Sequence, residues 1–256
     1  MRVIIALLAS LVAAAAVPTS QRIVGGSATN IRQYPSAVAL LYAPNIIFAY
    51  KQECGGTLLN RRSILTAAHC PYLDPPSRWR VHVGSSHPTY YGTSYGFIRF
   101  IYHPNFNVNT RDSDIAILRT ASNVEMSALA QPAGIAGANY NLGDNQVVWA
   151  VGWGRTQPNN AVGSSQLQHV QIWTINQAIC RQRYAAASRT ITDNMLCAGV
   201  LDVGGRGQCN GDYGGPLYHN NVVVGISSFG IGCDHPVYPG VNVRVSRFTQ
   251  WIVNNA

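Results

Sequence analysis

Lysine is nearly absent from this chain of 256 residues: Lys51 is the only one among 18 basic residues, and the other 17 are arginines. A guanidinium keeps its charge above about pH 12, whereas a lysine ammonium loses its charge at about pH 10.4. This composition suits a surface that must stay charged in an alkaline fluid, although drift in base composition would produce the same pattern. Charged residues of both signs are also scarce, at 11% beside 47% hydrophobic residues, and this balance excludes an intrinsically disordered chain.

Other features are missing, and each absence removes a class of protein. The net charge of +8 is not gathered into a dense basic run or a basic and aromatic stripe, so nucleic acid is not an expected partner. No repeat of roughly 33 to 45 residues stands out, which argues against solenoids and propellers. No Asn-x-Ser/Thr triplet occurs, so N-glycosylation is not expected.

Long apolar runs are missing beyond the N-terminus. Arg2 precedes the apolar run Val3–Ala16, which ends in three small residues and is too short to span a bilayer comfortably. Residues 1–16 therefore predict a secretory signal peptide, with a signal anchor as the alternative. The interpretation indicates a secreted, extracellular protein that has no membrane partner.

A short propeptide is predicted directly after this segment. Residues 17–22 read VPTSQR, and a small apolar pair begins at Ile23. Cleavage after Arg22 would release a free amino group on Ile23. The alternative is an incidental arginine with no role in processing.

Beyond residue 22 the pattern favours an all-β protein. Short runs rich in β-branched and aromatic residues alternate with turn signals, as in a sandwich or a pair of barrels. These runs are Ser36–Leu41, Arg80–Val83, Gly96–Ile101, Val147–Val151, Leu167–Ile175, Val222–Phe229 and Val241–Val245. A helix capped by Ser246 is predicted at the end of the chain, and a second short helix is predicted near Asn176.

Three polar features together indicate a nucleophilic site. His69 lies beside Cys70 at the end of an apolar stretch, and Asp114 precedes another. The glycine-rich segment 211–216, GDYGGP, could present backbone N–H groups to a substrate. A lone histidine is most often structural, and a lone aspartate before a strand is most often a cap. All three in this order are much rarer.

The sequence resembles the trypsin/chymotrypsin family of serine proteases, of the secreted zymogen type found among insect digestive enzymes, from Arg22 to the C-terminus. The motifs that carry the resemblance are IVGG at 23–26, CGGTLL at 54–59, LTAAHC at 65–70, DIAIL at 114–118, GWG at 152–154, GDYGGP at 211–216 and PGVNVRV at 239–245. The resemblance implies two six-stranded antiparallel β-barrels with the active-site cleft between them, and a C-terminal helix. Residues 23–256 would form this trypsin-like domain, and a trypsin-like protease would cut after Arg22.

Six cysteines follow the signal segment, in a secretory route where disulfides persist. They permit 15 pairings, and the residues alone do not choose among them. The resemblance implies the pairs Cys54–Cys70, Cys180–Cys197 and Cys209–Cys233.

The catalytic residues match the family at two positions of three. The resemblance makes His69 the general base and Asp114 the residue that orients it. The nucleophile position holds Tyr213, where the family has serine. A phenol oxygen lies a whole ring further from the backbone than a serine oxygen, so it is misplaced for attack on a carbonyl. The alternative is an allele or a sequence error at this codon.

The resemblance also supplies the surrounding apparatus. The N–H groups of Gly211 and Tyr213 would form the oxyanion hole. Asp212 would pair with the new amino group of Ile23 and so organise this turn.

The specificity pocket is expected to be open and apolar. Gly207 stands where trypsins carry an aspartate, so chymotrypsin-type preference is expected, and Arg206 beside it could repel a cationic side chain. The pocket residues implied by the resemblance are Gly207, Ser228, Phe229, Gly230 and Gly240. The loop Ser85–Gly96 contains no acidic residue, so no calcium or other metal is expected, and no cofactor is implied.

The sequence is compatible with two functions. As written, the sequence predicts a secreted, non-catalytic protease homologue that binds protein or peptide substrates or inhibitors in its cleft, as a monomer. If Tyr213 is an allele or an error, the sequence predicts an active extracellular digestive serine endopeptidase with a chymotrypsin-like pocket.

Overall fold

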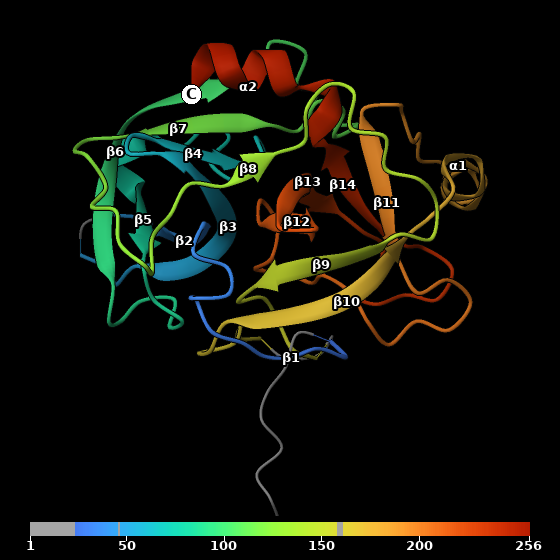
Figure 1. Ribbon diagram of the computed structural model, residues 1–256, viewed down its shortest axis with the longest axis horizontal. Coiled ribbons are helices and arrows are strands. Elements are labelled where there is room, and N and C mark those ends of the chain that lie inside the picture. Colours follow the sequence, from blue (N-terminus) through green and yellow to red (C-terminus); the bar gives the residue numbers. More distant parts are fainter. Residues whose placement is uncertain (1–23, 46, 158–160) are drawn as a thin grey trace, which may run out of the picture.

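A computed structural model describes residues 24–45, 47–157 and 161–256. Most of the regular structure is β-strand, and it forms two barrels side by side (Figure 1). The first barrel closes in the order β2-β3-β4-β7-β6-β5, with β5 pairing back onto β2. Its strands are β2 (Ala37–Tyr42), β3 (Lys51–Asn60), β4 (Ser63–Thr66), β5 (Trp79–Val83), β6 (Thr93–Tyr102) and β7 (Ala116–Thr120).

The second barrel comes from the C-terminal half of the chain. Six antiparallel strands follow the order β10-β11-β14-β13-β12-β9, and the pairing of β9 with β10 closes them. They are β9 (Val147–Gly152), β10 (Gln168–Thr174), β11 (Met195–Gly199), β12 (Pro216–His219), β13 (Val222–Phe229) and β14 (Gly240–Arg244). The short strands β1 (Ser27–Ala28) and β8 (Gly134–Ile135) pair with β10 and β13. The predicted pair of six-stranded antiparallel barrels is therefore confirmed.

Two helices complete the fold in the described residues. Helix α1 (Gln177–Ala185) begins after Asn176, whose side chain accepts hydrogen bonds from the N–H groups of Ala178 and Ile179. Helix α2 (Thr249–Asn255) follows the last strand, and 3-10 turns cover Pro76–Arg78 and Val245–Arg247. Ser246 was expected to cap α2, but it lies inside the 3-10 turn Val245–Arg247. Helix α2 begins one residue after that turn, and the intervening residue, Phe248, is buried in the core.

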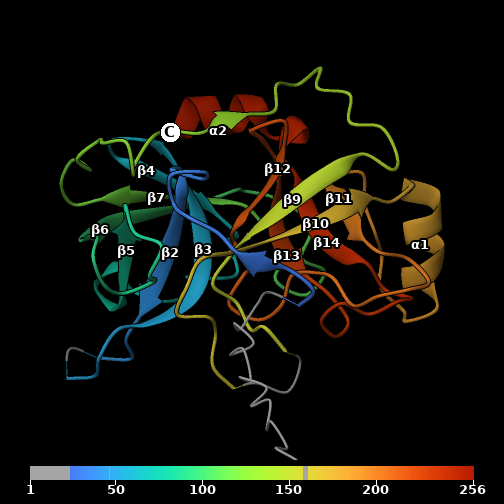
Figure 2. The same ribbon diagram turned by 60° about the horizontal axis from the view of Figure 1, so that its bottom comes forward.

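The two barrels share one hydrophobic core. Leu65, Ile115 and Ile117 of the first barrel belong to the same buried cluster as Val148 and Leu217 of the second. Figure 2 shows β2 and β3 beside the second barrel, where β2 contacts β9 and β3 contacts β12. The ends of strands from both barrels therefore meet along one seam, and the candidate site lies there. In the described part of the chain, no helix has the length and apolar character needed to cross a membrane.

Candidate active site

His69 and Asp114 come together because their strands pair. His69 follows β4 and Asp114 precedes β7, and Thr66 of β4 lies opposite Ala116 of β7. The His69 Nδ1 is 2.7 Å from Asp114 Oδ2, and the His69 backbone N–H donates to Asp114 Oδ1 at 2.8 Å. Asp114 therefore holds both the ring and the backbone of His69 in one orientation.

Asp114 is buried, and a second side chain supports it. The Ser228 hydroxyl donates to Asp114 Oδ2 at 2.5 Å. Burial raises the pKa of Asp114 to about 7, while the hydrogen bond from Ser228 and the charge of Arg111 act in the opposite direction. Ser228 was expected in the specificity pocket; its hydroxyl instead binds the Asp114 carboxylate. The sequence gives only a weak signal for this role, since Ser228 is one of two consecutive serines that precede Phe229 in β13.

Tyr213 lies in the turn that leads into β12. Its ring meets the His69 ring edge-on, with centroids 5.7 Å apart and planes at 68°. The side chain is half-buried and packs against the core of the first barrel, and burial raises the pKa of its phenol. The aromatic ring therefore occupies the space beside His69.

Asp212 is fully enclosed next to this turn. Its carboxylate accepts hydrogen bonds from the Gly154 N–H at 2.7 Å and from the Cys209 N–H at 3.0 Å. A Cβ on Gly152 or Gly154 would overlap the carboxylate, which explains the two glycines of the GWG motif. Burial raises the pKa of Asp212 to about 7, against the effect of these two bonds.

The expected cationic partner of Asp212 lies outside the described residues. Within residues 24–45, 47–157 and 161–256, no basic side chain forms an ion pair with this carboxylate. Ile23 and Arg22, with the predicted signal and propeptide segments, lie in the part that the structure does not describe.

Gly211 occupies a backbone conformation that the surrounding residues hold in place. Gly211 has a φ of +96°, a conformation that favours glycine. Its carbonyl accepts a hydrogen bond from the Gln52 side chain at 2.6 Å. Among the described residues, neither the Gly211 N–H nor the Tyr213 N–H donates a hydrogen bond. These are the two N–H groups that the family resemblance assigns to the oxyanion hole.

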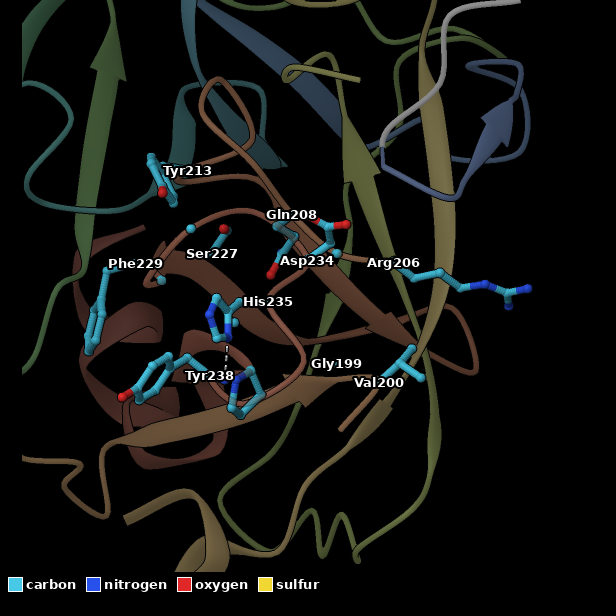
Figure 3. A pocket seen from close by; sticks show the side chains of 15 residues that line it. Gly199, Val200, Arg206, Gln208, Tyr213, Ser227, Phe229, Asp234, His235 and Tyr238 are labelled. Carbon is cyan, nitrogen blue, oxygen red and sulfur yellow. Dashed lines mark hydrogen bonds between the residues drawn. The ribbon is translucent and has the colours of Figure 1, made fainter. Parts of the chain in front are cut away.

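The pocket beside this site contains four of the five expected residues. Figure 3 shows its lining, which includes Tyr213 and Phe229. Gly207, Phe229, Gly230 and Gly240 line it, and Ser228 does not.

Polar side chains line the pocket together with the expected glycines and Phe229. Its cavity is about 20 Å³, which is room for about one water molecule. Asp234, Gln208 and His235 all line the pocket, and none of them belongs to a motif that marks it in the sequence.

Three disulfides surround the site. They are Cys54–Cys70, Cys180–Cys197 and Cys209–Cys233, the pairs implied by the family resemblance. The first holds the segment of His69 against β3, and the third joins the segments on the two sides of the pocket. In the described chain, the one group with metal-ligand spacing is Cys54, His69 and Cys70. Its two sulfurs are bonded to each other, so they offer no thiolate to a metal.

Comparison with known proteins agrees with this architecture. The family model described as Trypsin matches residues 23–252. "Trypsin, alkaline A" of Manduca sexta is 58% identical, and "Trypsin CFT-1" of Choristoneura fumiferana is 57% identical, each over 100% of both chains. "Achelase-1" of Lonomia achelous is 52% identical over 91% of this chain and 100% of its own. With its two barrels, its three disulfides and the His69–Asp114 pair, the chain belongs to the trypsin family.

Proposed function

We propose that this protein is a secreted, non-catalytic member of the trypsin family that binds peptide segments of proteins or inhibitors in its cleft. The observation that carries the proposal is Tyr213 at the position of the family's nucleophile. The proposal includes removal of residues 1–16 as a signal peptide and of residues 17–22 by a trypsin-like protease that cuts after Arg22. Relatives that align over the whole of this chain, among them the two named above, also cover residues 1–22, which supports a shared N-terminal arrangement.

The chemistry of residue 213 is the reason for inactivity. In the family mechanism His69 takes a proton from an oxygen one bond beyond Cβ, and that oxygen attacks the scissile carbonyl. The Tyr213 oxygen lies across the ring, and the ring itself stands against His69. His69, Asp114 and Ser228 thus hold a general base in place with no nucleophile in reach.

Covalent labelling tests this proposal. The protein cleaved after Arg22 is incubated with a fluorophosphonate and with a chromogenic peptide, in parallel with Tyr213→Ser and with Tyr72→Ser as a matched control in a different loop. We expect no labelling and no turnover from the natural chain and the control, and both from Tyr213→Ser. Losing a triad member leaves only about 10³–10⁴-fold acceleration over water. Labelling of the natural chain at the level of Tyr213→Ser would refute the proposal.

A second candidate is an active extracellular endopeptidase. The intact His69–Asp114–Ser228 arrangement supports it, and so do the printed names of the relatives, which are trypsins. It requires that residue 213 of the natural protein be serine. Sequencing codon 213 from independent individuals separates the two candidates, because tyrosine in every copy leaves only the first.

A further inference from the structure

Asn210 and Gly211 form the one Asn-Gly pair of the chain, directly before Asp212 and Tyr213. The Asn210 side chain is exposed, and within the described residues its amide has no hydrogen-bond partner. The proposed function does not use this amide. An unbonded asparagine amide beside a glycine is a reactive pair, because the next backbone nitrogen reaches the side-chain carbonyl carbon by closing a five-membered ring.

The Gly211 nitrogen is free to take part in this reaction. Its N–H donates no hydrogen bond to a described residue, whereas the carbonyls on both sides are held. The Asn210 carbonyl accepts from the Arg155 N–H at 2.8 Å, and the Gly211 carbonyl accepts from the Gln52 side chain at 2.6 Å. Gly211 has no Cβ, and its φ of +96° is a conformation that favours glycine. No side chain of Gly211 therefore shields its nitrogen from the Asn210 amide.

We propose that Asn210 is a site of spontaneous modification, in which ring closure onto Gly211 converts the asparagine to aspartate or isoaspartate. The deprotonated Gly211 nitrogen attacks the side-chain carbonyl carbon of Asn210 and forms a C–N bond. The side-chain nitrogen takes up a proton and leaves as ammonia. Water then opens the ring by breaking one of its two C–N bonds: addition at the side-chain carbonyl gives aspartate, and addition at the main-chain carbonyl gives isoaspartate.

The modification acts on the cleft itself. The closed ring has no Gly211 N–H, which is one of the two donors that the family resemblance assigns to the oxyanion hole. Both products then place a carboxylate where a neutral amide stood, and isoaspartate also lengthens the main chain between Cys209 and Gly211. A negative charge at this position weakens the binding of a carbonyl oxygen or an anion by these N–H groups. The inference goes beyond the proposed function and holds whether or not the chain is catalytic.

Peptide mapping by mass spectrometry tests the inference on the disulfide-bonded chain cleaved after Arg22. The folded chain is incubated in neutral and in alkaline buffer and then digested in acid, and isoaspartate is detected by enzymatic methylation of its carboxylate. We expect conversion at Asn210 to accelerate about tenfold for each unit of pH, because the reacting species is the deprotonated nitrogen. Its rate should lie within about tenfold of the rate in the reduced, denatured chain, since neither reacting group must first break a hydrogen bond.

Two comparisons isolate the Asn-Gly pair. Asn221 is also exposed and has a φ of +62°, but Val222 of β13 follows it. The β-branched side chain shields the next nitrogen, so Asn221 should convert at least about tenfold more slowly. Asn210→Gln keeps an amide at this position but needs a six-membered ring, and it should show no conversion over the same time.

Two results would overturn the inference. One is an intact Asn210 in the folded chain under conditions in which the denatured chain converts, since the fold would then block ring closure. The other is an equal rate of conversion at Asn210 and Asn221. Turnover of a chromogenic peptide by the natural chain would contradict the proposed function alone, because the conversion of Asn210 is read from mass and methylation.

Discussion

Two buried carboxylates of the site differ in what stabilises them. Asp114 receives bonds from two side chains and a backbone N–H, so the ion is well solvated by the protein. Asp212 receives only two backbone N–H bonds from the described residues. A buried carboxylate without a cation is costly, and this cost is what a free amino group at residue 23 would offset.

In the chain that has not been cleaved after Arg22, ionised Asp212 should lower stability. Its folded pKa of about 7 lies above the unfolded value of about 3.9, so the folded state binds more protons between these values. The free energy of unfolding should therefore fall as pH rises from about 4 to 7, by up to about 4 kcal/mol. Above pH 7, titration of Asp212 should cause no further change. Urea unfolding across this pH range measures the slope.

Asp212→Asn should flatten this slope in part, because Asp114, whose pKa is also about 7, keeps its own contribution. The variant also weakens the fold at every pH because its amide N–H₂ faces backbone donors. Cleavage after Arg22 should flatten it too, since a paired carboxylate has a lower pKa. Asp202→Asn, at an exposed site, is the control and should leave the slope unchanged. An identical slope in the uncleaved natural chain and in Asp212→Asn would show that Asp212 does not carry the effect.

The two helices contact different parts of the fold. Helix α2 joins the barrels, because His103 of the first barrel packs against Phe248 and Trp251, and Figure 1 shows the helix reaching from β14 toward β7. Helix α1 stands at the outer side of the second barrel and buries Cys180 and Tyr184. The Asn176 side chain caps the start of α1, so a single substitution tests its contribution to stability.

Asn176→Ala should destabilise the protein by about 1 kcal/mol, the usual cost of losing an N-cap. The Asn176 side chain accepts from the N–H groups of Ala178 and Ile179 and also donates to Asp144 at 2.7 Å. Asn176→Ser is the matched variant, because serine retains the cap but loses the bond to Asp144. Denaturant midpoints should rank natural chain, Ser and Ala in decreasing order. A serine variant as unstable as the alanine variant would assign the loss to Asp144 instead of the cap.

For the whole molecule, the turn at residue 213 is part of the joint between the barrels. The Tyr213 carbonyl accepts from the Gly55 N–H at 2.8 Å, and the Gly214 N–H donates to the Ser227 carbonyl at 2.7 Å. Gly55 lies in β3 of the first barrel and Ser227 in β13 of the second. The site is therefore held by the same contacts that fix the two barrels together, and a change in the turn acts on both.

Gly214→Ala tests this joint. Gly214 has a φ of +80°, and an added Cβ would overlap Thr66 Oγ1 and lie 2.6 Å from the Gly55 carbonyl oxygen. We expect a loss of about 3 kcal/mol or more, from backbone strain together with separation of the barrels at this point. Gly134→Ala is the control, because its Cβ meets no atom within 4 Å, and its effect should stay below about 0.5 kcal/mol. Equal thermal midpoints for the two variants would contradict the prediction.

Much of the architecture can be predicted from short motifs in the chain. Several expected runs form strands whose ends differ from the prediction by a few residues. The run Val222–Phe229 forms β13 with the predicted bounds. Strand β3 was not expected, because its Cys-Gly-Gly segment lacks a strand pattern. Its glycine serves a contact distant in sequence: a Cβ on Gly55 would lie 2.7 Å from the Gly215 Cα of the other barrel. Local propensity carries no information about such a contact.

The candidate site also combines residues that motifs indicate with contacts that only the folded chain forms. Motifs identify His69, Asp114 and Tyr213, because the chemistry of each residue type is visible in its neighbours along the chain. The Ser228–Asp114 bond joins residues 114 positions apart, and the pocket brings Asp234 beside Gly207. These features depend on closure of the barrels and on packing between distant segments, which residue type and spacing along one chain do not encode.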